Sequence, residues 1–176
     1  MPPPAPEDDE PPAAPPIADD WERFDRPYYG LIADGIHVHP TAVRMAYRSH
    51  PKGCILTTDC LFIMDPHAKD GRYPFRPGTD LVRKGKRVTL GDSATLVGSA
   101  VDLQTCVLNL AAFAGIPLHE ALASVTTHPA RMLGGEVERR KGRLERGFDA
   151  DLVVLDKQGR VRATWVRGVE VWRRPE

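Results

Sequence analysis

Two segments that each follow a buried apolar run contain the residues best suited to chemistry. The first is residues 33–40 (ADGIHVHP), which includes His37, and the second is residues 56–59 (LTTD), which ends on Asp59. A carboxylate at the carboxyl end of a buried strand can act as a general base and then as a general acid, because burial and neighbouring groups shift its pKa towards the working range. A loop-capping role is the alternative for Asp59. We take Asp59 as the candidate catalytic residue.

His37 could donate an N–H to a substrate carbonyl or hold a hydroxyl group, although a histidine beside a turn is often only hydrogen-bonded within the protein. His37 and His39 also have the spacing of a two-histidine metal site. Gly35 and Pro40 indicate a loop at this point, however, and no segment rich in histidine or carboxylate follows. We therefore treat His37 as a substrate-binding candidate and assign no metal ligand to this chain.

A third segment, residues 94–99 (ATLVGS), is predicted to form a turn of small residues immediately before a helix. Free backbone N–H groups at the amino terminus of a helix can bind a carbonyl, hydroxyl or phosphate oxygen. An ordinary N-cap role for Ser99 is an equally good alternative. Together with the two strand ends, this segment predicts the rim of a pocket.

The elements that position these segments alternate between strand and helix. Apolar runs at 28–33 and 54–58 are typical of buried strands, and Pro40 favours a helix from 41 to about 49. Further helices are predicted at 101–114, at 118–125, and from Pro129 to Gly134 and Gly135. This order, with polar residues after each strand, is typical of the carboxyl edge of an α/β barrel.

The remaining segments do not follow this alternation. Residues 61–94 are rich in Gly, Pro and charge, and they predict a long excursion with a hairpin that includes a strand at 87–90. Short strands are predicted at 151–156, 161–166 and 169–172, the last two joined by a tight turn at Arg167 and Gly168. We therefore expect a disordered segment rich in proline and acidic residues at 1–20, barrel sequence at 21–140, and part of a small β domain at 141–176.

The composition argues against several classes of protein. The chain has 176 residues, is 41% hydrophobic and carries a formal net charge of zero, which gives no footprint for nucleic acid or an anionic membrane. Its three cysteines have no CxxC spacing, so they fit neither a disulfide framework nor a zinc knuckle. No apolar run approaches the roughly 20 residues of a membrane span, and the first residues have no signal-peptide pattern. We expect a cytoplasmic protein.

A series of motifs in order resembles the N-acetylglucosamine-6-phosphate deacetylases of the amidohydrolase superfamily, with a fungal character in the MDPH segment. The motifs are IADGIHVHP, TTDC, MDPH, TLVGSAVDLQTCVLNL, THPARMLG, KGRLERGFDADLVVLD and TWVRGVEVW. The KGRLERGFDADLVVLD motif is shared by many amidohydrolases, whereas ADGIH and TLVGS indicate the deacetylase. The resemblance implies an α/β fold: the carboxyl-terminal part of a TIM-like (β/α)8 barrel, with strands of a small β-sandwich domain.

The resemblance also implies a reaction, the metal-dependent hydrolysis of N-acetyl-D-glucosamine 6-phosphate to D-glucosamine 6-phosphate and acetate in amino-sugar catabolism. Asp59 would activate the metal-bound water and later protonate the leaving amine, while His37 would contact the sugar or its acetamido carbonyl. A divalent metal such as zinc would lower the pKa of the water and stabilise the tetrahedral oxyanion. The family's substrate-contacting turn matches Leu96, Val97 and Gly98.

Two departures from the family pattern qualify this expectation. The family's metal ligands, a glutamate and two histidines, lie on earlier barrel strands, and no segment before Tyr28 matches them. Cys60 stands where the family usually has alanine after the catalytic Asp. We therefore expect a truncated deacetylase with little activity of its own.

The alternatives are a catalytically inactive remnant that binds a sugar phosphate or a partner chain, and a different amidohydrolase related to dihydroorotases or hydantoinases. The TLVGS motif argues against the last of these. We also expect a possible homodimer, by analogy with the family.

Overall fold

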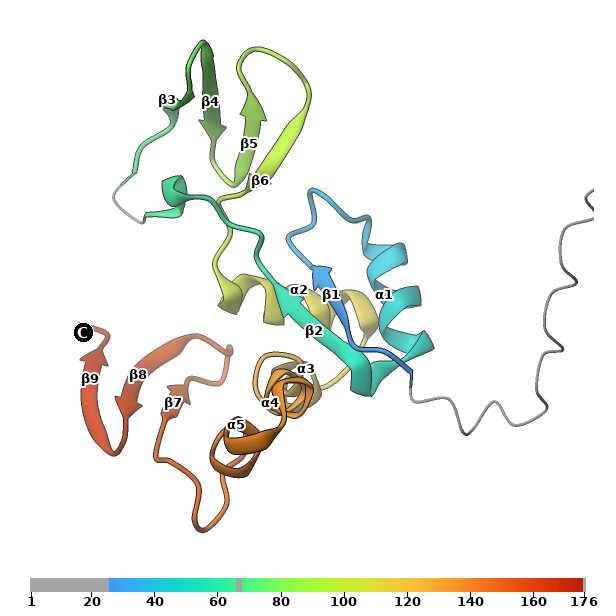
Figure 1. The fold of residues 1–176 in the computed structure, drawn as a ribbon, viewed down its shortest axis with the longest axis vertical. Helices are drawn as coiled ribbons and strands as arrows, with labels where there is room; N and C mark the ends of the chain where they lie inside the picture. Colours follow the sequence, from blue (N-terminus) through green and yellow to red (C-terminus); the bar gives the residue numbers. More distant parts are fainter. Residues whose placement is uncertain (1–25, 66–67, 176) are drawn as a thin grey trace, which may run out of the picture.

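The computed structural model describes residues 26–65 and 68–175, so the segment 1–20 that we expected to be disordered lies outside the described residues (Figure 1). Its first elements are a parallel pair of strands, β1 (Tyr29–Ile32) and β2 (Cys54–Thr57), with Ile32 opposite Thr57. The connection between them contains helix α1 (Pro40–Ser49) and the short 3-10 helix η2 (Pro51–Gly53). The predicted strand–helix–strand order is confirmed.

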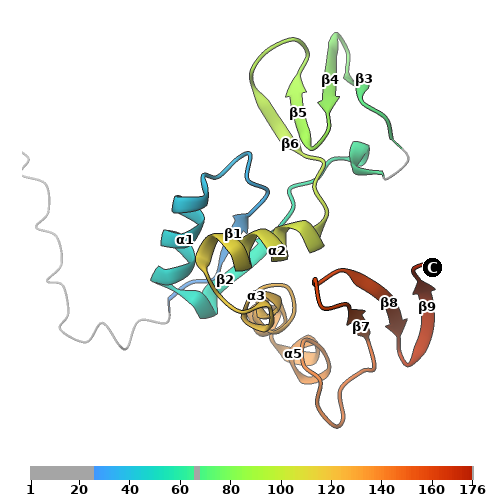
Figure 2. The ribbon, with the colours of Figure 1, turned by 180° about the vertical axis from the view of Figure 1, so that it is seen from behind.

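Residues 103–140 contain four helices: α2 (Leu103–Ala114), α3 (Leu118–Ala123), α4 (Thr127–Leu133) and α5 (Gly135–Arg140). Helix α2 lies across the β1/β2 pair and also packs against α1 (Figure 2). The core between these elements consists of fully or nearly fully buried apolar side chains, among them Leu31, Val43, Leu56, Cys106 and Leu110. Burial of one such side chain is worth about 1.5–3 kcal/mol, so this cluster holds the strand ends in place.

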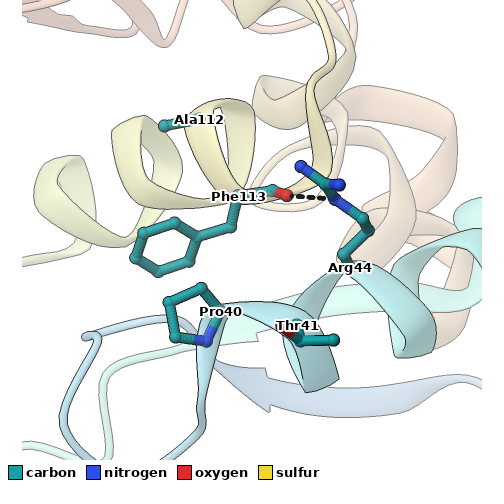
Figure 3. A pocket seen from close by; sticks show the side chains of 5 residues that line it. All are labelled: Pro40, Thr41, Arg44, Ala112 and Phe113. Atoms are coloured by element: carbon teal, nitrogen blue, oxygen red, sulfur yellow. Dashed lines mark hydrogen bonds between the residues drawn. The ribbon is translucent and has the colours of Figure 1, made fainter.

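The carboxyl end of α2 is fixed to α1 by an arginine. Arg44 Nε donates a hydrogen bond of 2.7 Å to the carbonyl oxygen of Phe113, one of the groups that a helix end leaves unpaired (Figure 3). The cation also lies at the negative end of the α2 dipole. A small cavity of about 260 Å³ beside this contact is lined by Pro40, Thr41, Arg44, Ala112 and Phe113.

Residues 61–65 and 68–99 form a separate lobe that projects away from the β1/β2 pair (Figures 1 and 2). After the 3-10 helix η3 (Phe62–Met64), an antiparallel sheet is built in chain order from β3 (Gly71–Arg76), β4 (Thr79–Lys84), β5 (Arg87–Leu90) and β6 (Leu96–Ser99). The lobe has its own small core, in which Ile63, Leu81 and Val88 are buried. The predicted hairpin is therefore part of a four-stranded sheet.

The prediction that residues 94–99 form a turn immediately before a helix is wrong. Leu96–Ser99 is a strand, and α2 begins four residues later with Asp102 as its N-cap. The Asp102 carboxylate accepts a hydrogen bond of 2.7 Å from the Thr105 amide. The Ser99 hydroxyl instead donates to the carbonyl of Thr58, so Ser99 connects β6 to the loop after β2 and does not cap a helix.

The last part of the chain is an antiparallel sheet of β7 (Leu152–Leu155), β8 (Val161–Val166) and β9 (Val169–Arg173). The predicted two-residue turn is confirmed: Arg167 and Gly168 both have positive φ, at 50° and 80°, as a primed hairpin turn requires. The sheet is linked to α2 by a 2.6 Å hydrogen bond from the Val161 amide to Gln104 Oε1. Several of its apolar side chains are exposed: Val153, Val154, Val166, Val169, Val171 and Trp172.

The architecture is thus a mixed α/β arrangement in which β1 and β2 form an open parallel pair. Within residues 26–65 and 68–175, β1 pairs with no strand other than β2, and no barrel is closed. None of the helices in this part of the chain is long and apolar enough to cross a membrane.

Candidate functional site

The loop after β1 is organised by a carboxylate that is buried completely. Asp34 Oδ1 accepts hydrogen bonds from the amides of Ile36 and His37 at 2.9 and 3.0 Å, and Oδ2 lies 2.7 Å from His37 Nδ1. The Asp34 side chain has no exposed surface, and the His37 side chain is 18% exposed. An aspartate that accepts from amides two and three residues later is an Asx turn, and here it also orients a side chain.

These hydrogen bonds determine the charge of Asp34. Burial acts to raise its pKa, but the amide of His37, the His37 ring and the amide of Ile36 together outweigh burial and lower the pKa below the ordinary value. Asp34 is therefore ionised at neutral pH. Sequence reasoning did not single out Asp34, although an Asp-Gly pair directly after an apolar run is a recognisable signal for such a turn.

The loop after β2 differs in that its aspartate is exposed. Asp59 lies two residues beyond the end of β2 and has a φ of 49°, the left-handed region that non-glycine residues rarely adopt. Its amide is 3.4 Å from the hydroxyl of Thr57, the residue that ends β2. The loop therefore presents the Asp59 side chain to solvent at the carboxyl end of the strand.

Strand β6 supports the Asp59 loop through its backbone. The Ser99 amide donates to the carbonyl of Asp59 at 2.8 Å, and the Leu61 amide donates to the carbonyl of Ser99 at 3.1 Å. Gly98, with φ of 59°, lies so close that a Cβ atom on it would stand 2.8 Å from the Asp59 carbonyl and from Leu61 Cγ. The predicted juxtaposition of the TLVGS segment with Asp59 is therefore present, although its backbone is a strand.

The three predicted site segments lie at one end of the parallel pair. Asp59 and the stretch Leu96, Val97 and Gly98 are joined by the contacts of Ser99 and Gly98, and His37 follows the neighbouring strand. In the described part of the chain, no hydrogen bond or ion pair connects the side chains of His37 and Asp59. The buried thiol of Cys106 is no candidate nucleophile, since burial raises its pKa to about 11.

The described residues do not fit a metal centre by themselves. Residues 26–65 and 68–175 contain no group of three or more His, Cys, Asp or Glu side chains that could hold a metal ion. The two histidines of the HxH pair have different partners, because His39 Nδ1 accepts from the Thr41 amide at 3.2 Å and His37 Nδ1 faces Asp34. This pair is therefore used for local structure.

A larger apolar groove of about 750 Å³ lies between helices α2 to α5 and strand β7. Its lining includes Leu103, Leu133, Leu144 and Val153, and it contains none of the predicted site residues. Size alone would select this groove, but an acid–base reaction requires a suitably placed titratable group, which the strand-end loops supply. We place the candidate site at those loops.

A match to a protein family covers most of the chain. Residues 18–171 match the amidohydrolase family. The chain belongs to the amidohydrolase family. Its relatives include the N-acetylglucosamine-6-phosphate deacetylase of Danio rerio, which is 40% identical over 148 residues, corresponding to 84% of this chain and 35% of the relative. The human N-acetylglucosamine-6-phosphate deacetylase is 37% identical over 145 residues.

Among these amidohydrolases is also a shorter protein, the putative N-acetylgalactosamine-6-phosphate deacetylase of Escherichia coli K12. It is 34% identical over 143 residues, and the match covers 81% of this chain and 82% of that protein. By contrast, this chain spans about 35% of the length of the animal relatives.

Solved structures of amidohydrolases resemble the described fold. The N-acetylglucosamine-6-phosphate deacetylase of Thermotoga maritima superposes with a TM-score of 0.74 at 28% identity, over 84% of this chain and 39% of that structure. A mutant of the Mycobacterium smegmatis deacetylase in complex with N-acetyl-D-glucosamine-6-phosphate gives a TM-score of 0.71 at 29% identity, over 82% of this chain and 37% of that one. The fold is thus that of a part of these deacetylases.

Proposed function

We propose that this chain is the carboxyl-terminal part of an N-acetylglucosamine-6-phosphate deacetylase and contributes its acid–base residue. The observation that carries the proposal is the exposed carboxylate of Asp59 at the carboxyl end of a parallel strand, held by the backbone of β6. Two relatives named as such deacetylases, from Danio rerio and Bos taurus, are each 40% identical to this chain over more than four fifths of its length. Both observations concern the same segments, which supports assigning the reaction to this site.

In the proposed reaction, the Asp59 carboxylate takes a proton from a water molecule as the water oxygen attacks the acetamido carbonyl carbon. The carbon–nitrogen bond of the tetrahedral species then breaks, and Asp59 returns the proton to the leaving nitrogen. The products are acetate and the free amine of glucosamine 6-phosphate. Proton transfer of this kind contributes typically 10²–10⁴-fold to a rate.

The complete protein would use a divalent metal, as proposed from the family resemblance. Because the described residues offer no complete ligand set, its ligands would lie elsewhere in the complete protein. We further propose that residues 21–140 are barrel sequence and residues 141–176 part of a small β domain. A cytoplasmic location stays a prediction.

The direct test is deacetylation of N-acetylglucosamine 6-phosphate by the 176-residue chain with added divalent metal. A second protein, here called the hybrid, carries this chain in place of the matching segment of the Danio rerio relative. We expect the hybrid to release acetate and its Asp59→Asn variant to have lost most of that activity. An inactive but folded hybrid would contradict the proposal, and N-acetylgalactosamine 6-phosphate as a second substrate would test the choice of sugar.

A second candidate function is association with a partner chain. One observation that favours it is the open outer edge of β1 in the described structure. Another is the exposed apolar residues on the β7–β9 sheet, such as Val169, which is 65% exposed. The partner would be a polypeptide that adds a parallel strand beside β1. Sedimentation of the chain alone and mixed with the first two thirds of the Danio rerio relative would detect such a complex.

A further inference from the structure

The pairing of Asp34 with His37 determines which ring nitrogen can meet a ligand. A carboxylate has only acceptor oxygens, and both oxygens of Asp34 are already engaged, one by two amides and one by His37 Nδ1. Because Asp34 is ionised, the proton in the 2.7 Å contact must reside on His37 Nδ1. In a neutral imidazole the other nitrogen, Nε2, then has a lone pair and no proton.

The Nε2 atom of His37 is in an unusual situation. It is buried, and within the described residues it has no hydrogen-bond partner. Leaving a buried polar atom unpaired costs about 1–3 kcal/mol, so a group from outside this part of the chain is expected to satisfy it. That group must be a donor if the ring is neutral.

The geometry points to Asp34 as a positioning residue: we propose that it keeps a ring proton of His37 on Nδ1, so that Nε2 of the neutral imidazole accepts a hydrogen bond from a hydroxyl or amide N–H of the ligand. This inference rests on the proposed function for the identity of that ligand, which would offer a sugar hydroxyl or its acetamido N–H. In the neutral ring this arrangement excludes the other role expected for His37, donation of an N–H to the substrate carbonyl. The carbonyl would have to be polarised by another group.

The test is nitrogen NMR of the full chain labelled with ¹⁵N-histidine at pH 8, which distinguishes protonated from unprotonated ring nitrogens. Two other histidines serve as internal references. His128 Nδ1 lies 2.8 Å from the Cys54 carbonyl and must be protonated, whereas His39 Nδ1 accepts from the Thr41 amide and must not be. We expect His37 to match His128, with an unprotonated Nε2.

The Asp34→Asn variant separates positioning from packing. The asparagine carbonyl can still accept from the two loop amides, while its NH₂ group donates to His37 Nδ1 and thereby moves the ring proton to Nε2. We expect His37 to switch tautomer while His39 and His128 keep theirs. If the variant does not fold, the wild-type spectrum still decides, because a protonated His37 Nε2 at pH 8 would overturn the proposal.

Addition of N-acetylglucosamine 6-phosphate to the hybrid should shift the His37 Nε2 resonance while leaving that nitrogen unprotonated. Protonation of Nε2 on binding would overturn the inference, as would an unchanged tautomer in folded Asp34→Asn. A folded hybrid with the expected tautomer that does not bind the sugar phosphate would support the role of Asp34 and contradict the proposed function.

Discussion

The loops that follow β1 and β2 are neighbours at one end of a parallel pair, yet they hold their aspartates in opposite ways. Asp34 is fully buried and accepts three hydrogen bonds, whereas Asp59 is exposed and is held by its backbone, with φ of 49° and a contact to β6. The first arrangement fixes another side chain and leaves no free oxygen. The second leaves the carboxylate available.

This difference indicates that a carboxylate at a strand end is not in itself a sign of catalysis. A group that must exchange protons with a substrate needs a free oxygen and access, and of these two aspartates only Asp59 has both in the described part of the chain. A group that orients a neighbour needs burial and full hydrogen bonding, which Asp34 has. Four substitutions and one pH series, on the two loops and on residues that contact them, would break or sharpen the comparison.

The largest effect is expected at Asp59. In the hybrid, Asp59→Asn should lower kcat by about 10³-fold, because the amide can neither take nor return the proton. Its free energy of unfolding should change by less than about 0.5 kcal/mol, as for other exposed sites. Acetate release and urea denaturation measure the two quantities, and a large loss of stability with unchanged kcat would reverse the assignment.

Replacing Asp34 should act mainly on stability. Asp34→Ala removes a buried acceptor of three hydrogen bonds and leaves two loop amides without it, so we expect a loss of about 2–4 kcal/mol. Asp102→Ala is the matched control, since this aspartate accepts two hydrogen bonds at an exposed helix N-cap and should cost about 1 kcal/mol. If urea denaturation showed equal losses of stability for Asp34→Ala and Asp102→Ala, burial would not add to the stabilisation by Asp34.

The stabilisation by Asp34 should depend on pH in a defined direction. Its pKa is lower in the folded than in the unfolded chain, so the ionised form stabilises the fold above the ordinary value of 3.8 and the effect is lost as pH falls through the folded pKa. The difference in unfolding free energy between wild type and Asp34→Asn should therefore shrink below about pH 3.8. Denaturation series at pH 7 and pH 3 would show it, and a difference that grows in acid would contradict the sign.

The Asp59 loop should be sensitive to the glycine that touches it. Gly98→Ala places a methyl group 2.8 Å from the Asp59 carbonyl, and we expect a loss of about 2–4 kcal/mol together with lower activity of the hybrid. Gly85→Ala has the same φ of 59° but no atom within 4 Å of the added Cβ, so it measures backbone strain alone, about 1 kcal/mol. Similar losses of stability for Gly98→Ala and Gly85→Ala would mean that the close contact with Asp59 does not contribute to the effect.

The smallest effect is expected at the link between α2 and the first loop. Asn109 Nδ2 donates a hydrogen bond of 2.8 Å to the Ala33 carbonyl, directly before Asp34. Asn109→Ala should cost about 1 kcal/mol and leave the His37 tautomer unchanged, because Asp34 keeps its own contacts. Thermal denaturation and the NMR measurement together test this, and a changed tautomer would extend the positioning role to α2.

The sequence by itself determined the local elements of this protein. Apolar runs ending in polar residues identified β1 and β2, Pro40 marked the start of α1, and the Arg167–Gly168 pair identified the last hairpin, since each of these signals acts over a few residues. The order of the motifs was sufficient to relate the chain to the deacetylases. Asp59 was also selected at this level, by its place after an apolar run together with the resemblance to the deacetylases.

Only the tertiary structure decided how distant segments meet. Residues 96–99 pair with β5 (Arg87 opposite Ser99, Thr89 opposite Leu96), and Ser99 also contacts Asp59, about forty residues earlier. These contacts make the segment a strand where local reading predicted a turn before a helix. The role of Asp34 depends in the same way on how the loop after β1 closes and is covered by packed elements. Burial is a property of the packed chain, so the difference between a positioning and an available carboxylate cannot be read from residue types alone.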